Sequence, residues 1–170
     1  MTISLRPYLP ADAARLAEIF VASIEEIASE DYDSAQCAAW AAAADDAAAF
    51  SARLGKSLTL VGLVDGEVAG FVSLKGADVI DLLYVHPEYA RQKVATTLCE
   101  AIERLAGARG AASLVVDASD TAHTFFALRG YTGERRNTVI VDDQWLGNTT
   151  MRKPLAANDA GKAPTGRSSG

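Results

Sequence analysis

Cysteine, positive charge and long apolar runs are all scarce in this sequence, and each scarcity excludes a class of protein. The 170 residues include two cysteines, Cys37 and Cys99, whose separation fits neither a zinc site nor a Cys-x-x-Cys redox motif. We expect both to be buried free thiols and predict no metal centre. No apolar run reaches the ~18 residues that a transmembrane helix needs, and the N-terminal segment lacks the apolar core of a secretory signal. We therefore expect a cytoplasmic protein without membrane contact.

Basic residues are outnumbered, with 16 Lys and Arg against 22 Asp and Glu, and the formal net charge is −6. Such a balance disfavours a general nucleic-acid-binding protein, although it is compatible with a local basic site for a phosphorylated cofactor. Apolar residues make up 49% of the chain, which is enough for one sizeable core. We predict a single domain over residues 1–155. Residues 156–170 offer no core residues, so we expect a disordered C-terminal tail there.

Hydrophobic periodicity and turn residues predict a mixed α/β sheet with the element order β-α-α-β-β-β-α-β-α-β-β. The expected strands are residues 2–8, 57–64, 68–75, 79–87 and 112–118, followed by two within 131–155 that are joined near 142–143. The expected helices are residues 12–28, 34–54 with a break near 45–46, 91–108 and 120–128. Asp65-Gly66 between apolar runs predicts a hairpin, and the nearly unbroken apolar centre of 79–87 predicts burial on both faces.

Residue types at the helix ends and along the helix faces refine this order. Asp12 and Ser34 are expected to be N-caps, and Gly55 is expected to stop the second helical stretch. Apolar spacing places a core stripe on two helices: Leu16, Ile19, Phe20, Ser23 and Ile27 on the first, and Val94, Leu98, Ile102 and Leu105 on the helix 91–108.

The segment 79–98 is the most informative part of the chain. An apolar strand ends at His86-Pro87, and a short basic loop with Arg91 and Lys93 leads into an amphipathic helix. The free N–H groups and the dipole of a helix N-terminus bind anions, so this joint suits a phosphate. An ordinary strand–loop–helix connection is the alternative interpretation. His86 fits a turn role before its proline, and His123 fits either an exposed helix position or a cofactor contact.

Three segments in this order resemble the GNAT superfamily of N-acetyltransferases over residues 3–155. Residues 82–103, LLYVHPEYARQKVATTLCEAIE, are similar to the acetyl-CoA motif of that family. Residues 118–131, ASDTAHTFFALRGY, are similar to its motif with a strand-end Asn, an Ala, an aromatic pair and a closing Gly-aromatic. Residues 65–75, DGEVAGFVSLK, resemble the hairpin that leads into the central strand. The resemblance implies a GNAT fold and acetyl transfer from acetyl-CoA to a small-molecule or peptide amine.

The resemblance also implies positions for the cosubstrate. The thioester carbonyl would lie near the backbone of the central strand at Leu83, Tyr84 and Val85. The pyrophosphate would meet the backbone amides of the loop and first helical turn, at Arg91, Gln92, Lys93, Val94, Ala95 and Thr96. The other side of the CoA arm would be lined by Ser119, Ala122, Phe125 and Phe126. A homodimer is compatible with the family, and nothing in the sequence proves one.

Two positions depart from the family pattern. Lys93 stands where the first glycine of the phosphate loop is expected; a lysine backbone could replace it if its φ stays negative, and its ammonium could pair with phosphate or block the loop. Phe126 stands where family members often have a tyrosine that protonates the CoA thiolate. A thiol with a pKa near 8.5 is a tolerable leaving group near neutral pH. We therefore expect a slower reaction, with solvent as the proton donor.

Asp81 is the best candidate for the catalytic base, because a carboxylate in the apolar strand VIDLLYV is costly unless it has a function or a partner. A structural or substrate-binding carboxylate is the alternative. Strand alternation predicts Asp81, Leu83 and Val85 on one face and Leu82 and Tyr84 on the other. Tyr84 is a second catalytic candidate, as an acid or a substrate contact, with simple packing as the alternative.

Acceptor recognition is expected from the first two helices. These helices and the loop between them carry an acidic cluster that could attract a cationic amine, formed by Glu25, Glu26, Glu30, Asp31 and Asp33. We predict substrate contacts from Glu26, Tyr32, Gln36 and Trp40. The alternatives are a solvated helix end and aromatic rings that join two helices. Three other functions stay open: a catalytically impaired acyl-CoA-binding or regulatory module, an interaction subunit that no longer binds CoA, and transfer to a macromolecular amine.

Overall fold

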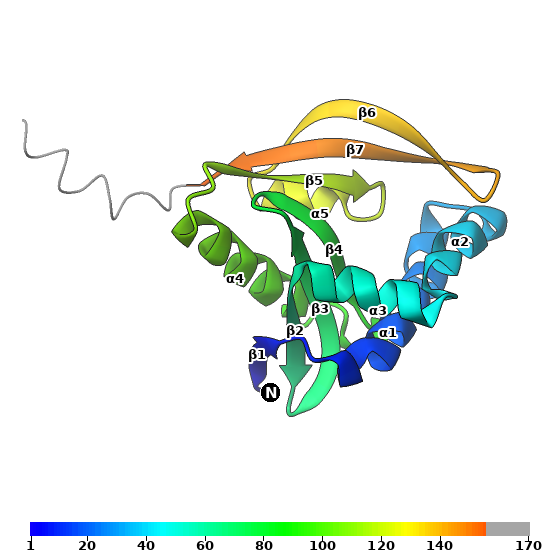
Figure 1. Cartoon of the computed structure of the whole chain (residues 1–170). Coiled ribbons are helices and arrows are strands. Elements are labelled where there is room, and N and C mark those ends of the chain that lie inside the picture. Colours follow the sequence, from blue (N-terminus) through cyan, green and yellow to red (C-terminus); the bar gives the residue numbers. More distant parts are fainter. Residues whose placement is uncertain (156–170) are drawn as a thin grey trace, which may run out of the picture.

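The computed structural model describes residues 1–155, so the expected C-terminal tail lies outside the described residues. The described chain forms a seven-stranded sheet with the strand order β1-β2-β3-β4-β5-β7-β6 (Figure 1). Its strands are β1 (Ile3–Pro7), β2 (Leu58–Val64), β3 (Glu67–Lys75), β4 (Val79–Val85), β5 (Ser113–Ser119), β6 (Thr132–Val141) and β7 (Gln144–Pro154). The predicted mixed α/β sheet and its element order are confirmed.

The sheet divides between its two central strands, β4 and β5. All neighbouring strands are antiparallel except this pair, which is parallel and aligns at only two positions, Val79 with Val115 and Ile80 with Val116. Beyond these positions the strands diverge, and Figure 1 shows β5, β7 and β6 crossing above the ends of β2, β3 and β4. The divergence leaves β4 without a neighbour on one side over its second half.

Helices cover both faces of the sheet. The helices are α1 (Ala13–Glu26), α2 (Ser34–Ala41), α3 (Ala47–Lys56), α4 (Val94–Ala108) and α5 (His123–Leu128), with short 3₁₀ turns at Pro10–Asp12, Ala28–Glu30, Ala42–Ala44 and Pro87–Tyr89. One core cluster packs α4 and α5 on one face, with Leu98, Ile102 and Phe126 at its centre. The other packs α1, α2 and α3 on the opposite face, around Phe20 and Phe71.

Several helix ends differ from the prediction, because the expected capping residues form other hydrogen bonds or a neighbouring residue caps the helix instead. Asp12 does not cap α1 with its side chain; its carboxylate accepts from the Arg6 guanidinium at 2.8 and 2.9 Å and from the Leu9 amide at 2.9 Å. Asp33, not Ser34, caps α2, and its carboxylate accepts from the Gln36 amide at 2.7 Å. The expected break near residues 45–46 is confirmed, whereas α3 runs through Gly55 to Lys56.

Two helices begin later than expected and two core stripes shift. Helix α4 starts at Val94 because the preceding loop has left-handed residues, and α5 starts at His123 after a turn. Leu105 is exposed, and the neighbouring Ala106 takes the core position instead. On α1 the fourth buried residue is Ile24, not Ser23 or Ile27. No helix in residues 1–155 is long and apolar enough to cross a membrane.

Candidate active site

The divergence of β4 and β5 opens a narrow cavity of about 80 Å³ between the two strands. Because the β4–β5 pairing ends at Ile80, the backbone groups of residues 82–85 that face away from β3 have no hydrogen-bond ladder with β5. An extended ligand with amide groups could take the place of β5 and form hydrogen bonds with these β4 backbone groups. The side chains that line this gap cavity are Trp40, Ile80, Asp81, Leu83, Tyr84, Val116, Asp117, Ala118, Ser119, Ala122 and Phe126.

A β-bulge at Asp81 turns its side chain toward the helices α1–α3. In the β3–β4 register Ser73 opposes Leu82 while Leu74 opposes Ile80, so Asp81 is the extra residue on β4. The extra residue reverses the alternation. The expectation that Asp81 shares a face with Leu83 and Val85 is therefore wrong, because Asp81 lines a cavity together with Leu82 and Tyr84.

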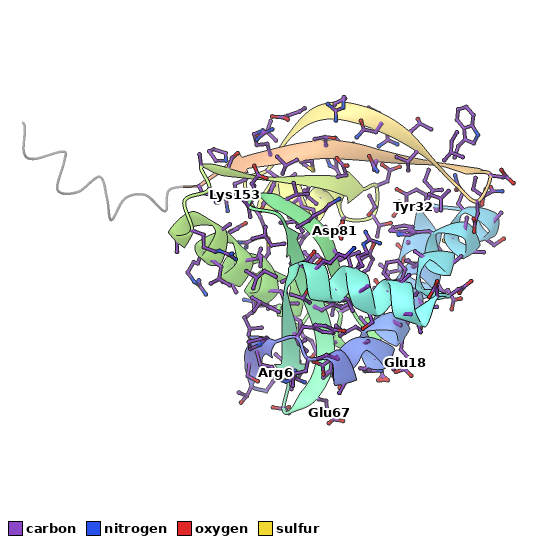
Figure 2. All side chains as sticks on the ribbon, in the orientation of Figure 1. Arg6, Glu18, Tyr32, Glu67, Asp81 and Lys153 are labelled. Carbon is purple, nitrogen blue, oxygen red and sulfur yellow. The ribbon has the colours of Figure 1, made fainter. Side chains whose placement is uncertain are left out.

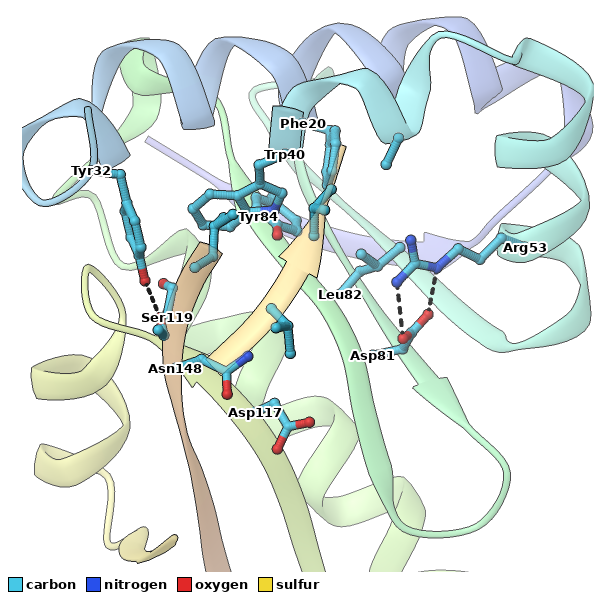
Figure 3. A pocket seen from close by; sticks show the side chains of 15 residues that line it. Phe20, Tyr32, Trp40, Arg53, Asp81, Leu82, Tyr84, Asp117, Ser119 and Asn148 are labelled. Carbon is cyan, nitrogen blue, oxygen red and sulfur yellow. Dashed lines mark hydrogen bonds and ion pairs between the residues drawn. The ribbon is translucent and has the colours of Figure 1, made fainter. Parts of the chain in front are cut away.

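That second cavity, the acceptor cavity, has a volume of about 270 Å³ and lies on the α1–α3 side of the sheet (Figure 3). Figure 3 shows aromatic side chains from α1, the segment before α2, and α2 on one side, and polar side chains from β5 and β7 below them. It is lined by Phe20, Tyr32, Trp40, Ala43, Arg53, Asp81, Leu82, Tyr84, Asp117, Ser119, Val139, Val141, Leu146, Gly147 and Asn148. Trp40, Asp81, Tyr84, Asp117 and Ser119 also line the gap cavity, so the two cavities meet there.

Asp81 is held in an ion pair with Arg53 of α3. The guanidinium donates from Nε to Oδ2 at 2.9 Å and from Nη2 to Oδ1 at 3.1 Å, so both carboxylate oxygens have a charged partner (Figure 3). The side chain of Asp81 is 17% exposed and that of Arg53 is 44% exposed. The guanidinium therefore holds both carboxylate oxygens of Asp81 toward α3.

Asp117 of β5 reaches the same junction without such a partner. Its Oδ1 accepts a hydrogen bond from the Thr150 hydroxyl at 2.6 Å. Thr150 in turn accepts from the Asn137 amide at 2.8 Å and from Arg135 at 3.3 Å. Within residues 1–155 no basic side chain lies within ion-pair distance of Asp117. Asp117 is thus an exposed carboxylate at the junction that forms no direct ion pair within residues 1–155, with Arg135 on the other side of Thr150.

The β6–β7 hairpin covers the acceptor cavity and is fixed to the helices by two hydrogen bonds. The Tyr32 hydroxyl donates to the carbonyl of Gly147 at 2.7 Å and accepts from the amide of Asp120 at 2.8 Å. The Gln36 side chain donates to the carbonyl of Trp145 at 2.8 Å. Burial raises the pKa of Tyr32, so its hydroxyl stays protonated at neutral pH. Figure 2 shows Tyr32 beneath this hairpin, with Asp81 nearer the middle of the sheet.

Tyr84 is part of an aromatic cluster. Its ring centroid lies 4.8 Å from that of Phe20, 5.9 Å from that of Phe71 and 6.4 Å from that of Trp40. Burial among these rings raises the pKa of Tyr84 above its ordinary value near 10. This environment supports packing as its main role and makes Tyr84 a poor proton donor near neutral pH.

The loop between β4 and α4 has two non-glycine residues in the left-handed region, Arg91 at φ 63° and Lys93 at φ 68°. The expectation that Lys93 could replace the glycine with a negative φ is therefore wrong: the sharp turn into α4 requires the left-handed conformation. Such a residue costs roughly 1–2 kcal/mol relative to an ordinary backbone. The turn leaves the first amides of α4, at Val94, Ala95 and Thr96, without an intrahelical acceptor.

The remaining candidate residues lie in the gap cavity, in the loop before α4, in the acceptor cavity or outside both cavities. Ser119, Ala122 and Phe126 line the gap cavity, with Phe125 packed edge-on against Phe126 at 5.2 Å between centroids. Gln92 donates from its side chain to the carbonyl of Glu88 at 3.2 Å, which braces the loop. Tyr32 and Trp40 line the acceptor cavity, whereas Gln36 braces the hairpin and Glu26 lies on a separate surface of α1. The acidic cluster around Glu26 is thus not part of the acceptor cavity.

Several cavity residues were not expected from the sequence, and those with aromatic or polar side chains are Phe20, Arg53, Asp117 and Asn148. Asp117 had a usable signal, because it is an acidic residue in the apolar strand SLVVDAS, the same reasoning that singled out Asp81. Arg53 had no such signal, because it lies on a helix, 28 residues away from its partner Asp81. Asn148 lies opposite Ser119 in the β5–β7 register, which no local pattern encodes.

Comparisons with known proteins identify the family of this chain. A model described as an acetyltransferase (GNAT) domain matches residues 28–155. The N-acetyltransferase YafP of Escherichia coli K12 is 33% identical over 150 residues, which cover 88% of this chain and 95% of YafP. The crystal structure of a GCN5-related N-acetyltransferase from Rhodopseudomonas palustris is 58% identical with a TM-score of 0.89, and the match covers 91% of this chain and 97% of that one.

A more distant fold match is PaiA N-acetyltransferase from Thermoplasma acidophilum, solved in complex with coenzyme A. It is 18% identical with a TM-score of 0.77, and the match covers 91% of this chain and 100% of that one. The chain belongs to the GNAT family of N-acetyltransferases. The family that the sequence motifs indicated is thereby confirmed.

Proposed function

We propose that this enzyme transfers the acetyl group of acetyl-CoA directly to an amine while both substrates are bound. The observation that carries the proposal is the junction of two cavities at Trp40, Asp81, Tyr84, Asp117 and Ser119. A thioester in the gap cavity and an amine in the acceptor cavity would meet there. Direct attack needs no covalent enzyme intermediate, and Cys37 and Cys99 are both buried.

The gap suits the cosubstrate chemically. The unpaired backbone of residues 82–85 supplies partners for the amides of a pantetheine arm, and an N–H group of β4 is available to the thioester oxygen as it gains charge. The free amides at the start of α4, with the positive charges of Arg91 and Lys93, suit a pyrophosphate. Relatives of the same fold have been solved with coenzyme A or acetyl-CoA.

The attacking amine must lose a proton, which costs about 4–5 kcal/mol at pH 7 for an alkylamine with a pKa near 10.4. Two carboxylates face the junction. Asp81 is the residue that the sequence favoured, but both of its carboxylate oxygens are bonded to the Arg53 guanidinium. Within residues 1–155 Asp117 forms no ion pair, so we place proton removal on Asp117, directly or through a water molecule. Asp81 then serves to fix Arg53 and the wall of the cavity.

Phe126, which lines the gap, has no hydroxyl that could protonate the leaving thiolate. The hydroxyl groups that line the gap are those of Tyr84 and Ser119, and the Ser119 oxygen already accepts from the Ala122 amide at 3.1 Å. A thiol with a pKa near 8.5 leaves readily near neutral pH. Solvent therefore returns the proton, and the absent tyrosine lowers the rate without abolishing the reaction.

A catalytically impaired acyl-CoA-binding module is the second candidate, and the Lys93 backbone is the observation that favours it. A left-handed lysine directly before α4 brings a side chain to the place where phosphate would bind. This candidate predicts tight binding of CoA and no turnover of any amine.

The test is a calorimetric titration and thermal shift with acetyl-CoA and free CoA, followed by a thiol-release assay with amines. Wild type should be stabilised by both ligands, and Lys93→Glu should weaken the stabilisation because it reverses a charge at the phosphate end. Lys56→Glu, an exposed lysine on α3 outside both cavities, is the matched control. Binding without thiol release for any amine would favour the impaired module, and absence of binding would reject both functions.

A further inference from the structure

The acceptor cavity is small and largely apolar. Its volume of about 270 Å³ lies just below the range of roughly 300–1,000 Å³ that holds drug-sized ligands. Phe20, Trp40 and Tyr84 form one continuous aromatic wall, with Trp40 also packed edge-on against Tyr32 at 5.4 Å between centroids. Such a wall suits a compact apolar body, and aromatic faces also attract a cation.

The charges in the acceptor cavity add up to one negative charge. Arg53, Asp81 and Asp117 are the charged side chains among its lining residues within the described chain. Arg53 and Asp81 neutralise each other through two hydrogen bonds. The remaining charge belongs to Asp117, which lies at the junction with the gap cavity. This arrangement matches an acceptor with one ammonium group at its reacting end and no carboxylate beside it.

The hairpin makes the acceptor cavity unsuited to a long chain. Val139, Val141 and Leu146 line it from the β6–β7 hairpin. The hydrogen bonds from Tyr32 to Gly147 and from Gln36 to Trp145 hold that hairpin against the segment before α2 and against α2 itself. An extended peptide needs an open groove along the sheet, and the fixed hairpin occupies that side.

We propose, on the basis of the function proposed above, that the acceptor is a small free primary amine with one positive charge and a compact aromatic or similarly apolar body. The aromatic wall receives the body, Asp117 faces the ammonium, and the hairpin excludes polypeptide acceptors. The reaction forms the amide C–N bond and breaks the thioester C–S bond. The ammonium loses two protons, one to Asp117 before the attack and the second as the tetrahedral adduct collapses. One of them returns through solvent to the CoA thiolate, and the other is released to solvent.

The experiment compares four amines with the full-length enzyme and saturating acetyl-CoA, by thiol release and by mass of the product. Phenethylamine has one charge and an aromatic body; phenylalanine adds a carboxylate; spermidine has several charges and no apolar body; the fourth is a short peptide with a free lysine. We expect kcat/KM for phenethylamine to exceed each of the others at least 10-fold.

Two variants test the assignment of the walls. Trp40→Leu should lower kcat/KM for phenethylamine at least 5-fold and that for methylamine less than 2-fold. Its control, Trp145→Leu, replaces a tryptophan that is 66% exposed and should change neither value. Asp117→Asn should lower the ratio of kcat/KM for phenethylamine to that for phenylalanine at least 5-fold, because it removes the repulsion between Asp117 and the carboxylate of phenylalanine.

The outcomes separate this proposal from the one it rests on. Preferential acetylation of spermidine, phenylalanine or the peptide would overturn the acceptor class while leaving the acetyltransferase function intact. An equal loss in Trp40→Leu and Trp145→Leu would overturn the aromatic wall as the recognition surface. Acetyl-CoA binding without acetylation of any of the amines would overturn both proposals.

Discussion

The two walls of the β4–β5 gap differ in how they hold their carboxylates. Asp81 and Asp117 both interrupt apolar strands, VIDLLYV and SLVVDAS, and both reach the junction of the cavities. Asp81 is neutralised by Arg53, whereas Asp117 has only the hydroxyl of Thr150. Similar strand sequences therefore give one structural ion pair and one free anion. The difference comes from α3, which places the Arg53 guanidinium directly on Asp81, whereas Arg135 reaches Asp117 through the hydroxyl of Thr150.

The two carboxylates also reach the junction by different backbone routes. Asp117 follows the ordinary alternation of β5, in which Leu114, Val116 and Ala118 point to the opposite, buried face. Asp81 reaches it through the bulge opposite Ser73 and Leu74. An acidic residue in an apolar strand thus marks a site, but its role depends on the neighbours that other elements supply.

The largest expected effect is on catalysis at Asp117. Asp117→Asn should lower kcat/KM for an amine by about 10²-fold, which is the low end of the contribution of a general base. Steady-state thiol release at pH 8 measures it, with thermal shift by acetyl-CoA as the check that the gap is intact. Asp78→Asn, an exposed aspartate before β4, is the control and should retain wild-type activity. Unchanged kcat/KM in Asp117→Asn would remove Asp117 from the chemistry.

Gly70→Ala tests how closely β3 must approach β4, the strand that forms one side of the β4–β5 gap. A Cβ on Gly70 would lie 2.8 Å from the carbonyl oxygen of Tyr84, a backbone atom that cannot rotate away. We expect a loss of about 1–3 kcal/mol in the free energy of unfolding, as for other overpacked sites, measured by urea denaturation. Gly133→Ala, whose Cβ would meet Thr149 at 3.4 Å, should cost less. Equal losses in the two variants would show that the β4 wall has no special constraint.

Glu103 provides a reference carboxylate far from both walls. Burial alone would raise its pKa, but hydrogen bonds from Lys153 at 3.1 Å and Tyr131 at 2.9 Å, with the charge of Arg129, hold the pKa of Glu103 below its usual range. In Figure 2 the Lys153 label lies at the α4 end of the molecule, opposite that of Tyr32. The stability from a lowered pKa is present above the unfolded pKa near 4.5 and is lost as pH falls through the folded value.

Glu103→Gln should therefore lower the free energy of unfolding at pH 7 by about 1.5 kcal/mol, the value of a hydrogen-bonded buried charge. The loss should shrink as pH falls below the unfolded pKa near 4.5, since wild type then progressively loses the same interaction. Urea denaturation from pH 7 to pH 3 measures this, with the more exposed Glu100→Gln as the control. A pH-independent difference between wild type and Glu103→Gln would show that the charge of Glu103 contributes nothing.

The smallest expected effect is at Lys93, in the loop between β4 and α4. Lys93→Gly should raise the free energy of unfolding by about 1 kcal/mol, because glycine adopts a φ of 68° without the clash of a Cβ. Lys93→Ala removes the same charge and keeps the Cβ, so the difference between the two variants isolates backbone strain. Thermal unfolding without ligand measures both, and equal stability of Gly and Ala would contradict a strained loop.

The sequence predicted the parts of the fold that local patterns encode. Alternating apolar runs gave the strands, and Asp65-Gly66 marked the β2–β3 hairpin, where both residues have a positive φ. The motif at residues 82–103 located the β4–α4 joint and led to the family. These features depend on neighbours within a few residues, which is why one sequence was sufficient.

The details of the site could not be read from local patterns. The bulge at Asp81 adds one residue and reverses the side-chain direction, which a strict two-residue period misses. The Arg53–Asp81 pair and the Tyr32–Gly147 hydrogen bond join residues 28 and 115 positions apart. The acidic cluster of α1 was expected to recognise the amine, but the fold turns Glu26 to a different surface. Long-range packing decided each of these outcomes.

The most direct test of the unequal walls is a side-by-side measurement of kcat/KM for Asp81→Asn and Asp117→Asn with the same amine and saturating acetyl-CoA. We predict that the loss of kcat/KM in Asp117→Asn exceeds that in Asp81→Asn at least 10-fold. Of these two carboxylates, Asp117 is the one that forms no ion pair within the described chain. A larger loss at Asp81, or equal losses, would contradict it and return the role of base to the carboxylate that pairs with Arg53.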